Sequence, residues 1–344
     1  MPVTAQTMID RPPIFVVGTP RSGTTLLARI LGRHPEIYAP APGETHFFQE
    51  IWTRRQEFGD LADDEQLARV ADRVLNIFGI WDNPDLYELV TDSLDLETLL
   101  LRTRELGGGY AGLYYAFTSL FAESAGKPRY CDDTPKHLFY LHTIFDLFPG
   151  ARAIGCTRDP RDFLSSYKYY WQIAVDRARI KALYHPVNTS FLWRSSSNLL
   201  LQHATECCRE RLLLVKYESL VQQPEEQVRR VCDFLGLEYA ADLLQVGTSN
   251  SSFESPTGGI FTTSVGRWRT VLSPEEAWCV QTLTRKNMHR LGYVPEEQSP
   301  SRLGLLRTWL TAPLALVRAL RANAQKTGPL TQYLRQRLAP LVRR

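Results

Sequence analysis

A glycine-rich loop between a short apolar run and a helical pattern constrains this chain more than any other segment. The run from Ile14 to Val17 is typical of a buried strand, and apolar residues recur at helical spacing from Leu26 onwards. Gly18 and Gly23 have the Gly-x4-Gly spacing of a phosphate-binding loop, in which backbone N–H groups surround a phosphate at a helix N-terminus. The sequence therefore predicts a strand, a phosphate-binding loop and a helix in succession.

The loop differs at one position from the version found in nucleotide hydrolases. Those proteins have Lys followed by Ser or Thr directly after the second glycine, and the Lys contacts the β- and γ-phosphates. This chain has Thr24 and Thr25 there, and its basic residue, Arg21, lies inside the loop. We therefore expect the loop to bind a phosphate, but not to serve an ordinary nucleoside triphosphatase.

A second pattern of this kind follows another short apolar run, from Ala151 to Cys156. Arg158 comes just after the run, and Pro160 suits the first position of a helix, whose N-terminus favours an anion. An Arg side chain can form two charge-assisted hydrogen bonds with a phosphate. Ser166 lies eight residues after Arg158, in the predicted helix.

These two segments together resemble the sulfotransferases that use 3′-phosphoadenylyl sulfate as donor, most closely their bacterial, carbohydrate-acting and tyrosylprotein-like branches. The resemblance covers roughly residues 13–295. It implies that Arg158 and Ser166 bind the 3′-phosphate of the donor. The residues that it assigns to the 5′-phosphosulfate are Pro20, Arg21, Ser22, Gly23, Thr24 and Thr25.

A third segment, Gly266-Arg267-Trp268, resembles a loop of the same family that closes over the 3′-phosphate. Gly266 would let the backbone approach the phosphate, Arg267 would add positive charge, and Trp268 would support the loop or contact the purine. A solvated basic turn is the alternative. Ser273 and Glu276 follow with the spacing of a capping box, which predicts a helix start.

Sulfuryl transfer requires a base that removes the proton of the acceptor. The resemblance points to Glu44, because the carbohydrate and tyrosine branches use a Glu in a similarly placed element. His46 is the second candidate, since other members of the family use His from a different position. The alternatives are a surface carboxylate and a packed loop histidine.

The chain departs from the family between the two phosphate motifs. Many members have Lys-Thr-Pro or Lys-Ser-Pro there, with the Lys near the transferring group, whereas this chain has Asp133-Thr134-Pro135 and places Lys136 three residues later. Charge stabilisation then falls to Arg21 and the loop amides, or to Lys136. Asp133 could instead orient an acceptor, act as a second base or bind a cationic acceptor.

The fold expected is α/β, a P-loop-type parallel sheet flanked by helices, with a helical insertion and a basic C-terminal helical tail. The chain has 344 residues, enough for a large core. We predict a sulfotransferase domain over residues 1–298, with the insertion at about 52–125 contributing to the acceptor pocket. The predicted strands are Ile14–Val17, Arg129–Asp132, Ala151–Cys156 and Arg211–Lys216.

The tail, residues 299–344, has a different composition. From Arg302 to Arg344 it contains nine basic residues and no Asp or Glu, interspersed with Leu, Val and Trp. This composition is typical of a helix that lies on an anionic membrane surface. The alternatives are a basic amphipathic helix packed on the enzyme and a disordered tail.

Composition favours a cytoplasmic enzyme, peripheral to the inner face of the membrane if the tail binds there. Six cysteines lack Cys-x-x-Cys spacing, and no apolar signal segment or uncharged apolar stretch of about 18 residues is visible. The histidines are scattered, so no metal site is expected, and a net charge of +3 gives no reason to expect nucleic acid.

The function predicted is transfer of a sulfuryl group from 3′-phosphoadenylyl sulfate to a hydroxyl of a sugar, glycolipid, tyrosine or small alcohol. Two alternatives remain. One is a P-loop kinase or nucleotide phosphotransferase, which the missing Lys disfavours. The other is a catalytically inactive, membrane-associated binding protein, which Asp133 and the basic tail suggest. The sequence leaves the acceptor and the oligomeric state open.

Overall fold

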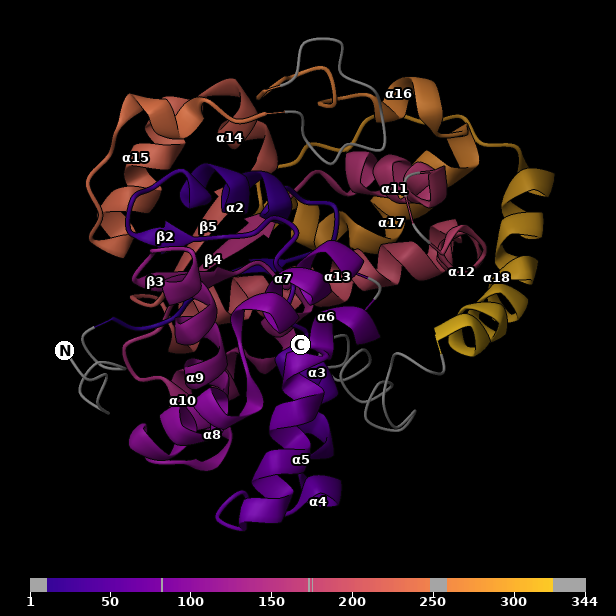
Figure 1. Cartoon of the computed structure of the whole chain (residues 1–344). Helices are drawn as coiled ribbons and strands as arrows, with labels where there is room; N and C mark the ends of the chain where they lie inside the picture. The colour runs from indigo at the N-terminus through magenta and orange to yellow at the C-terminus, as the bar shows by residue number, and fades with distance from the viewer. Residues whose placement is uncertain (1–10, 82, 173, 175, 248–258, 324–344) are drawn as a thin grey trace.

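A parallel sheet of five strands forms the centre of the molecule, in the order β2-β3-β1-β4-β5 (Figure 1). The computed structural model describes residues 11–81, 83–172, 174, 176–247 and 259–323. The strands are β1 (Ile14–Gly18), β2 (Ile37–Tyr38), β3 (Arg129–Asp132), β4 (Arg152–Thr157) and β5 (Leu212–Lys216). The predicted α/β fold is therefore confirmed. The sequence missed β2, because a two-residue strand has no periodicity to detect.

The central strand β1 is buried on both faces, as its uninterrupted apolar sequence requires. Successive side chains of a strand point to opposite faces, so Phe15 and Val17 enter one hydrophobic core while Ile14 and Val16 enter the other. Both cores depend on this strand, and it delivers the phosphate-binding loop from the middle of the sheet.

Helices cover both faces of the sheet (Figure 1). On the face of Ile14 lie α2 (Thr24–Gly32), α14 (Tyr217–Gln222) and α15 (Pro224–Leu235). On the face of Phe15 lie α9 (Gly109–Ser124), α10 (Leu141–Leu147) and α13 (Pro186–Gln202). The remaining helical elements are α3 (Phe47–Glu50), η1 (Trp52–Arg54), α4 (Arg55–Phe58), α5 (Asp64–Leu75), α6 (Ile77–Ile80), α7 (Pro84–Ser93), α8 (Leu96–Glu105), η2 (Pro135–Tyr140), α11 (Pro160–Tyr169), η3 (Tyr170–Gln172), α12 (Arg177–Leu183), η4 (His203–Cys207), η5 (Ala241–Leu244), α16 (Trp268–Val271), α17 (Pro274–Arg290) and α18 (Arg302–Asn323).

The chain between β2 and β3 is helical, and α5 illustrates why. The Asp63 side chain accepts a hydrogen bond from the backbone N–H of Gln66, which caps the helix. Leu67, Val70 and Val74 recur at helical spacing and are buried. The predicted capping box of α17 is confirmed in the same way, with Ser273 and Glu276 each accepting from the other's backbone.

The basic tail begins as α18, which runs along the outer edge of the molecule (Figure 1). Within the described chain, α18 is the one helix whose length and apolar composition would allow it to cross a membrane, which the sequence analysis did not expect. That test is weak evidence by itself, because helices of soluble proteins also pass it. The rest of the predicted tail, residues 324–344, lies outside the described residues.

The last residue of β1 leaves no room for a side chain. The φ of Gly18 is +146°, and a Cβ there would lie 2.2 Å from the carbonyl oxygen of Cys156 on β4. We predict that Gly18→Ala lowers the free energy of unfolding by about 3 kcal/mol or more, because a backbone clash adds to the conformational strain. Urea denaturation measures this loss.

Gly126→Ala is the matched control. Its φ is +69°, but a Cβ there meets nothing within 4 Å. This variant should lose only the cost of the left-handed conformation, about 1–2 kcal/mol. Equal losses at the two positions would contradict the proposed clash.

Candidate active site

A cavity of about 550 Å³ opens at the carboxyl ends of the strands, next to the loop that follows β1. The strand order reverses at β1, which lies between β3 and β4. In open α/β sheets, ligands bind at the carboxyl ends of the strands next to such a reversal. The predicted site residues that line the cavity are Pro20, Arg21, Gly23, Thr24, Thr25, Glu44, His46, Lys136, Arg158 and Ser166. Residues that were 145 positions apart in sequence, such as Arg21 and Ser166, meet here.

The loop presents buried polar groups at the start of α2. Gly23 occupies the N-cap with a φ of +94°, and no side chain caps the helix, so its first N–H groups face the loop. The hydroxyls of Thr19 and Ser22 are buried and have no hydrogen-bond partner among the described residues. Buried polar groups are almost always paired, so this arrangement is suited to an anion with several oxygen atoms.

The two predicted phosphate motifs are in direct contact. Nε of Arg21 donates to Oγ of Ser166 at 3.5 Å, and Nη1 of Arg158 donates to the carbonyl oxygen of Arg21 at 3.3 Å. Arg158 is 5% exposed, and its Nε has no hydrogen-bond partner among the described residues. Burial lowers the pKa of Arg21, and the neighbouring Arg158 lowers it further. The cavity thus holds two closely spaced cations, an arrangement that favours a ligand with more than one negative charge.

Tyr217 and Ser264 complete this side of the site, and the sequence analysis missed both. The guanidinium of Arg158 lies 4.3 Å from the Tyr217 ring centroid, and its Nη2 donates to the carbonyl oxygen of Ser264 at 2.8 Å. The Tyr217 ring also packs against Gly23, where an added Cβ would lie 2.7 Å from it. Tyr217 directly follows β5, so its place at the carboxyl end of a strand was the available signal.

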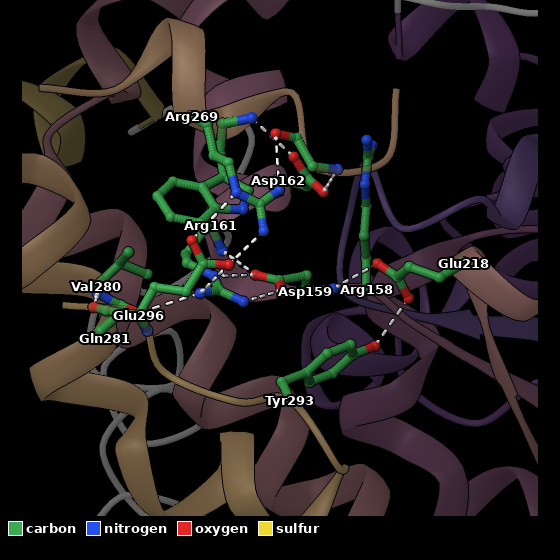
Figure 2. Close-up of polar contacts among 12 residues, drawn as sticks. Arg158, Asp159, Arg161, Asp162, Glu218, Arg269, Val280, Gln281, Tyr293 and Glu296 are labelled. Atoms are coloured by element: carbon green, nitrogen blue, oxygen red, sulfur yellow. Dashed lines mark hydrogen bonds and ion pairs between the residues drawn. The ribbon is translucent and has the colours of Figure 1, made fainter. Parts of the chain in front are cut away.

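A polar network fixes the backbone that carries Arg158 (Figure 2). Asp159 caps α11 by accepting from the Arg161 N–H at 2.8 Å, and its carboxylate pairs with the Arg161 guanidinium. The Asp159 N–H donates to Glu218 at 2.8 Å, and Tyr293 donates to the same carboxylate at 3.0 Å. The contacts of Asp159 with Arg161 and Glu218, and that of Tyr293 with Glu218, therefore hold the turn between β4 and α11 and position Arg158.

The third predicted segment supports the site but does not line the cavity. Asp162 accepts from the backbone N–H groups of Gly266 at 2.6 Å and Trp268 at 2.9 Å. Trp268 is buried, with the guanidinium of Arg161 4.5 Å from its ring centroid. Of the two roles offered for Trp268, this geometry favours supporting the loop. Arg267 is partly buried and is not among the cavity-lining residues.

Glu44 lies across the cavity as a partly buried carboxylate. Burial raises its pKa to about 7, and nearby Asp132 adds to the increase, while Lys136 and Arg21 oppose it. Its Oε2 is 3.2 Å from Nε2 of His46, whose ring stacks on Trp81 with centroids 3.8 Å apart. A carboxyl group with this pKa can accept a proton near neutral pH.

Asp132 and Asp133 hold the segment that carries Glu44. Asp132 is completely buried and accepts hydrogen bonds from the hydroxyls of Thr45 at 2.5 Å, Tyr114 at 3.0 Å and Thr134 at 2.6 Å. Asp133 is also completely buried and accepts from the Gly43 N–H at 2.7 Å. Burial, Glu44 and Asp132 raise the pKa of Asp133 well above its usual range.

Lys136 lies at the cavity wall. It lines the cavity, its Nζ lies 5.6 Å from the Trp81 ring centroid, and its charge opposes the rise in the Glu44 pKa. Asp133 instead points to the backbone of Gly43 and is absent from the lining. In this segment the cation that lines the cavity is therefore Lys136, and position 133 supplies none.

Two non-glycine residues of the described chain have positive φ, and both line this cavity. They are Arg21, with φ 67°, and His46, with φ 50°. Such conformations cost energy and persist only where the surroundings enforce them, which is common at functional sites. Each places a charged or polar side chain toward the cavity.

The far wall of the cavity comes mainly from the helices between β2 and β3, hereafter the helical region, and from α12. The sequence analysis predicted only that the helical insertion contributes to an acceptor pocket. Its polar and aromatic members outside the predicted set include Trp81, Asn83, Asp85, Tyr167, Tyr170, Asp176, Arg179 and Asn323. The guanidinium of Arg21 lies 4.6 Å from the Tyr170 ring centroid, so this wall reaches the loop. Tyr170 follows Ser166 by one helical turn, which was the only signal.

At the opposite, amino-terminal edge of the sheet, His142, His203 and Cys208 come together. Their ligand atoms lie within 4.8 Å of one another, a grouping that could hold a metal ion. Burial and the neighbouring His142 lower the pKa of His203 to about 4. The sequence analysis did not predict this cluster, because His142 lies far from His203 and Cys208 along the chain.

Comparison with known proteins agrees with this geometry. The model of the sulfotransferase family matches residues 12–241. The nodulation protein NoeE of Sinorhizobium fredii is 25% identical over 316 residues, covering 85% of this chain and 68% of that protein. A protein-tyrosine sulfotransferase of Drosophila melanogaster is 23% identical over 230 residues, covering 67% of this chain and 39% of that protein.

A solved structure supports the fold. The sulfotransferase domain of the Synechococcus PCC 7002 olefin synthase superposes with a TM-score of 0.52 at 24% identity, covering 82% of this chain and 94% of that domain. Since the family model spans most of the chain, the protein belongs to the sulfotransferase family, as its sequence motifs predicted.

Asp132 and Asp133 provide a matched test of these structural roles. We predict that Asp132→Asn lowers the free energy of unfolding at pH 7 by at least about 2 kcal/mol, because an amide cannot accept all the hydrogen bonds that the carboxylate accepts. Asp133→Asn should cost less than about 1 kcal/mol, because an amide oxygen can still accept from Gly43. Urea denaturation of both variants decides, and the reverse order would contradict the assignment.

Proposed function

We propose that this sulfotransferase moves a sulfuryl group from 3′-phosphoadenylyl sulfate to a hydroxyl of its acceptor. The observation that carries the proposal is the junction of the two anion-binding motifs. Arg21 in the loop after β1 contacts Ser166 on α11, and Arg158 contacts the loop backbone. A donor with phosphates at both its 5′ and 3′ positions requires two such sites close together.

The donor's 5′-phosphosulfate would bind the loop, through the N–H groups at the start of α2 and the side chains of Arg21, Thr24 and Thr25, which line the cavity. Its 3′-phosphate would bind Arg158 and Ser166. Gly266 and Trp268 would act indirectly, since their N–H groups are used by Asp162 and so fix the loop above Arg158.

Glu44 would act as the base. The positive charges of Lys136 and Arg21 lower its pKa, so both cations lie near the Glu44 carboxylate. These cations would surround the transferring group. Glu44 would take the acceptor's hydroxyl proton while the acceptor's hydroxyl oxygen forms its bond to sulfur. The bond between sulfur and the bridging oxygen of the donor breaks, and adenosine 3′,5′-bisphosphate leaves.

Arg21 and Lys136 would stabilise the negative charge that develops on the bridging oxygen. Asp133 would contribute by fixing Gly43, next to the base, rather than by contacting the acceptor. His46 would orient the Glu44 carboxylate, given the 3.2 Å separation and the stacking of its ring on Trp81. The mechanism therefore needs no cation at position 133.

The acceptor would occupy the part of the cavity formed by the helical region and α12. Carboxylates of Asp85 and Asp176 and the ring of Trp81 line that part. Carboxylates accept hydrogen bonds from hydroxyl groups, and an aromatic ring packs on the apolar face of a sugar or phenol. These groups support a hydroxyl-bearing acceptor.

A reducing compartment such as the cytoplasm would suit the protein. Cys131, Cys156, Cys208, Cys232 and Cys279 are buried as free thiols. Persisting reduced thiols are typical of intracellular proteins. The proposed compartment does not depend on the proposed reaction. Labelling of free thiols in freshly lysed cells tests it.

Binding of adenosine 3′,5′-bisphosphate tests the donor assignment. At 100 times its dissociation constant this ligand should stabilise the wild type by about 2.7 kcal/mol, visible as a higher Tm. Arg158→Ala should abolish the shift. Arg152→Ala, at the other end of the same strand β4, is the matched control and should retain it.

ADP with Mg²⁺ is the discriminating comparison. If it stabilises the wild type as well as the bisphosphate does, the 3′-phosphate site is absent and a nucleotide phosphotransferase takes the place of the proposal. Stabilisation of Arg158→Ala equal to that of the wild type would also contradict it.

The pH dependence of turnover tests the base. Glu44 acts as the carboxylate, so kcat should rise as pH increases through about 7 and level off above it. Glu44→Gln should lower kcat by about 10²- to 10⁴-fold and remove this rise. His46→Gln is the control. If that variant removes the rise while Glu44→Gln keeps it, the histidine is the base.

A further inference from the structure

The outer face of α18 is the most apolar exposed surface of the described chain. Ten large apolar side chains are exposed in the described chain as a whole, and seven of them belong to this helix. The seven are Leu303, Leu306, Trp309, Leu310, Leu314, Leu316 and Val317. Leu303, Leu310 and Leu314 are more than two-thirds exposed, at 76%, 70% and 74%. Side chains spaced by three and four residues share one helix face, so these form a continuous stripe, hereafter the apolar stripe.

The other side of α18 is fixed to the enzyme. Ala312 and Ala315 are buried against the body. Asn188 on α13 donates to the carbonyl oxygen of Ala312 at 3.1 Å, and Arg318 donates to the carbonyl oxygens of Ala182 and Tyr184 at 3.3 and 3.4 Å. These contacts set the rotation of the helix about its axis. The apolar stripe consequently faces away from the enzyme.

The charged residues of α18 itself all have one sign, although Glu275 of α17 accepts from the Ser301 N–H just before the helix at 3.0 Å. Arg302, Arg307 and Arg321 on α18 are exposed. No Asp or Glu occurs from Arg302 to Arg344, a range with nine basic residues. An exposed apolar stripe whose own helix carries only arginines as charged residues, with a Trp among its members, has the composition of a helix at the interface of an anionic membrane.

We propose that the apolar stripe of α18 docks the enzyme on the surface of an anionic phospholipid bilayer, with the helix lying in the plane of the interface. The leucines enter the acyl boundary, and the arginines contact lipid phosphates. A spanning orientation would break the polar contacts that Asn188 and Arg318 make with the rest of the chain. Pairing of two copies through the stripe would bring arginines of like charge together, which disfavours a dimer.

This docking has a consequence for the acceptor, which rests on the proposed function. Asn323 at the end of α18 lines the cavity, together with Arg179 and Leu183 of α12, against which α18 packs. Arg179 also donates to Asn323 at 3.2 Å. The docked surface therefore lies beside one wall of the cavity. A hydroxyl on an amphiphilic or lipid-linked acceptor would be presented there from the membrane.

Vesicle co-sedimentation of the full chain tests the docking. The probes are vesicles of phosphatidylcholine alone and of phosphatidylcholine with phosphatidylglycerol at about three to one, a mixture with strong negative surface charge. Wild type should bind the anionic vesicles and bind the neutral ones more weakly. Leu314→Glu should reduce binding by at least about tenfold, because it places a charge in the stripe. Arg307→Gln should weaken only the preference for anionic lipid, by about fivefold.

Val294→Glu is the matched control, since Val294 is exposed to the same extent, 74%, but lies outside α18. It should bind vesicles like the wild type. Absence of vesicle binding by wild type, or equal loss in Leu314→Glu and Val294→Glu, would overturn the proposal. So would a dimer by light scattering that Leu314→Glu converts to a monomer, because a second copy would then cover the stripe.

Stabilisation by adenosine 3′,5′-bisphosphate, measured on the same variants, separates the two proposals. If Leu314→Glu no longer binds vesicles but is still stabilised by the bisphosphate, that variant is folded and its donor site is intact. A wild type that binds vesicles but not the bisphosphate would leave the docking in place and remove the proposed function.

Discussion

The buried carboxylate of Asp132 is the interaction on which the geometry of the site depends most. It stands at the end of β3 and accepts from Thr45 next to Glu44, from Tyr114 on α9 and from Thr134 just before η2. A buried carboxyl group without hydrogen-bond partners is costly, so these bonds tie the three segments to the end of β3. Glu44 and Lys136 lie next to two of those segments, which fixes both relative to the sheet.

The opposite side of the cavity is rigid for a different reason, close backbone packing. Gly18 lies against the Cys156 carbonyl, Gly23 lies against the Tyr217 ring, and the turn before α11 is held by Asp159 and Glu218. The side of the cavity that holds Arg21 and Arg158 is therefore built from strand ends and their turns, whereas the opposite side comes from the helical region and α12.

The features that could be predicted from the sequence were local. The four longer strands and the phosphate-binding loop follow from short apolar runs and glycine spacing, and the capping box of α17 follows from three-residue spacing. Long-range contacts could not be predicted. Nothing near Asp133 in sequence indicates that its partner is Gly43, and nothing near Trp268 indicates that Asp162 takes its N–H. Arg267 was predicted to add charge at the donor, and Trp268 to support the loop or contact the purine. Neither residue lines the cavity, and the hydrogen bond from the Trp268 N–H to Asp162 favours the supporting role. A contribution of the insertion at about 52–125 to the pocket was predicted, but the individual lining residues were not, since that wall is assembled from segments with no shared motif.

The most direct test of the central claim is a crystal structure of the protein with adenosine 3′,5′-bisphosphate. The account predicts the 5′-phosphate within hydrogen-bond distance of the N–H groups at the start of α2, and the 3′-phosphate against Arg158 and Ser166. Arg21 should lie between the two, with Glu44 and Lys136 facing the side from which an acceptor would enter. A bisphosphate bound with only one phosphate in the site, or bound outside the cavity, would contradict the assignment of both motifs to one donor.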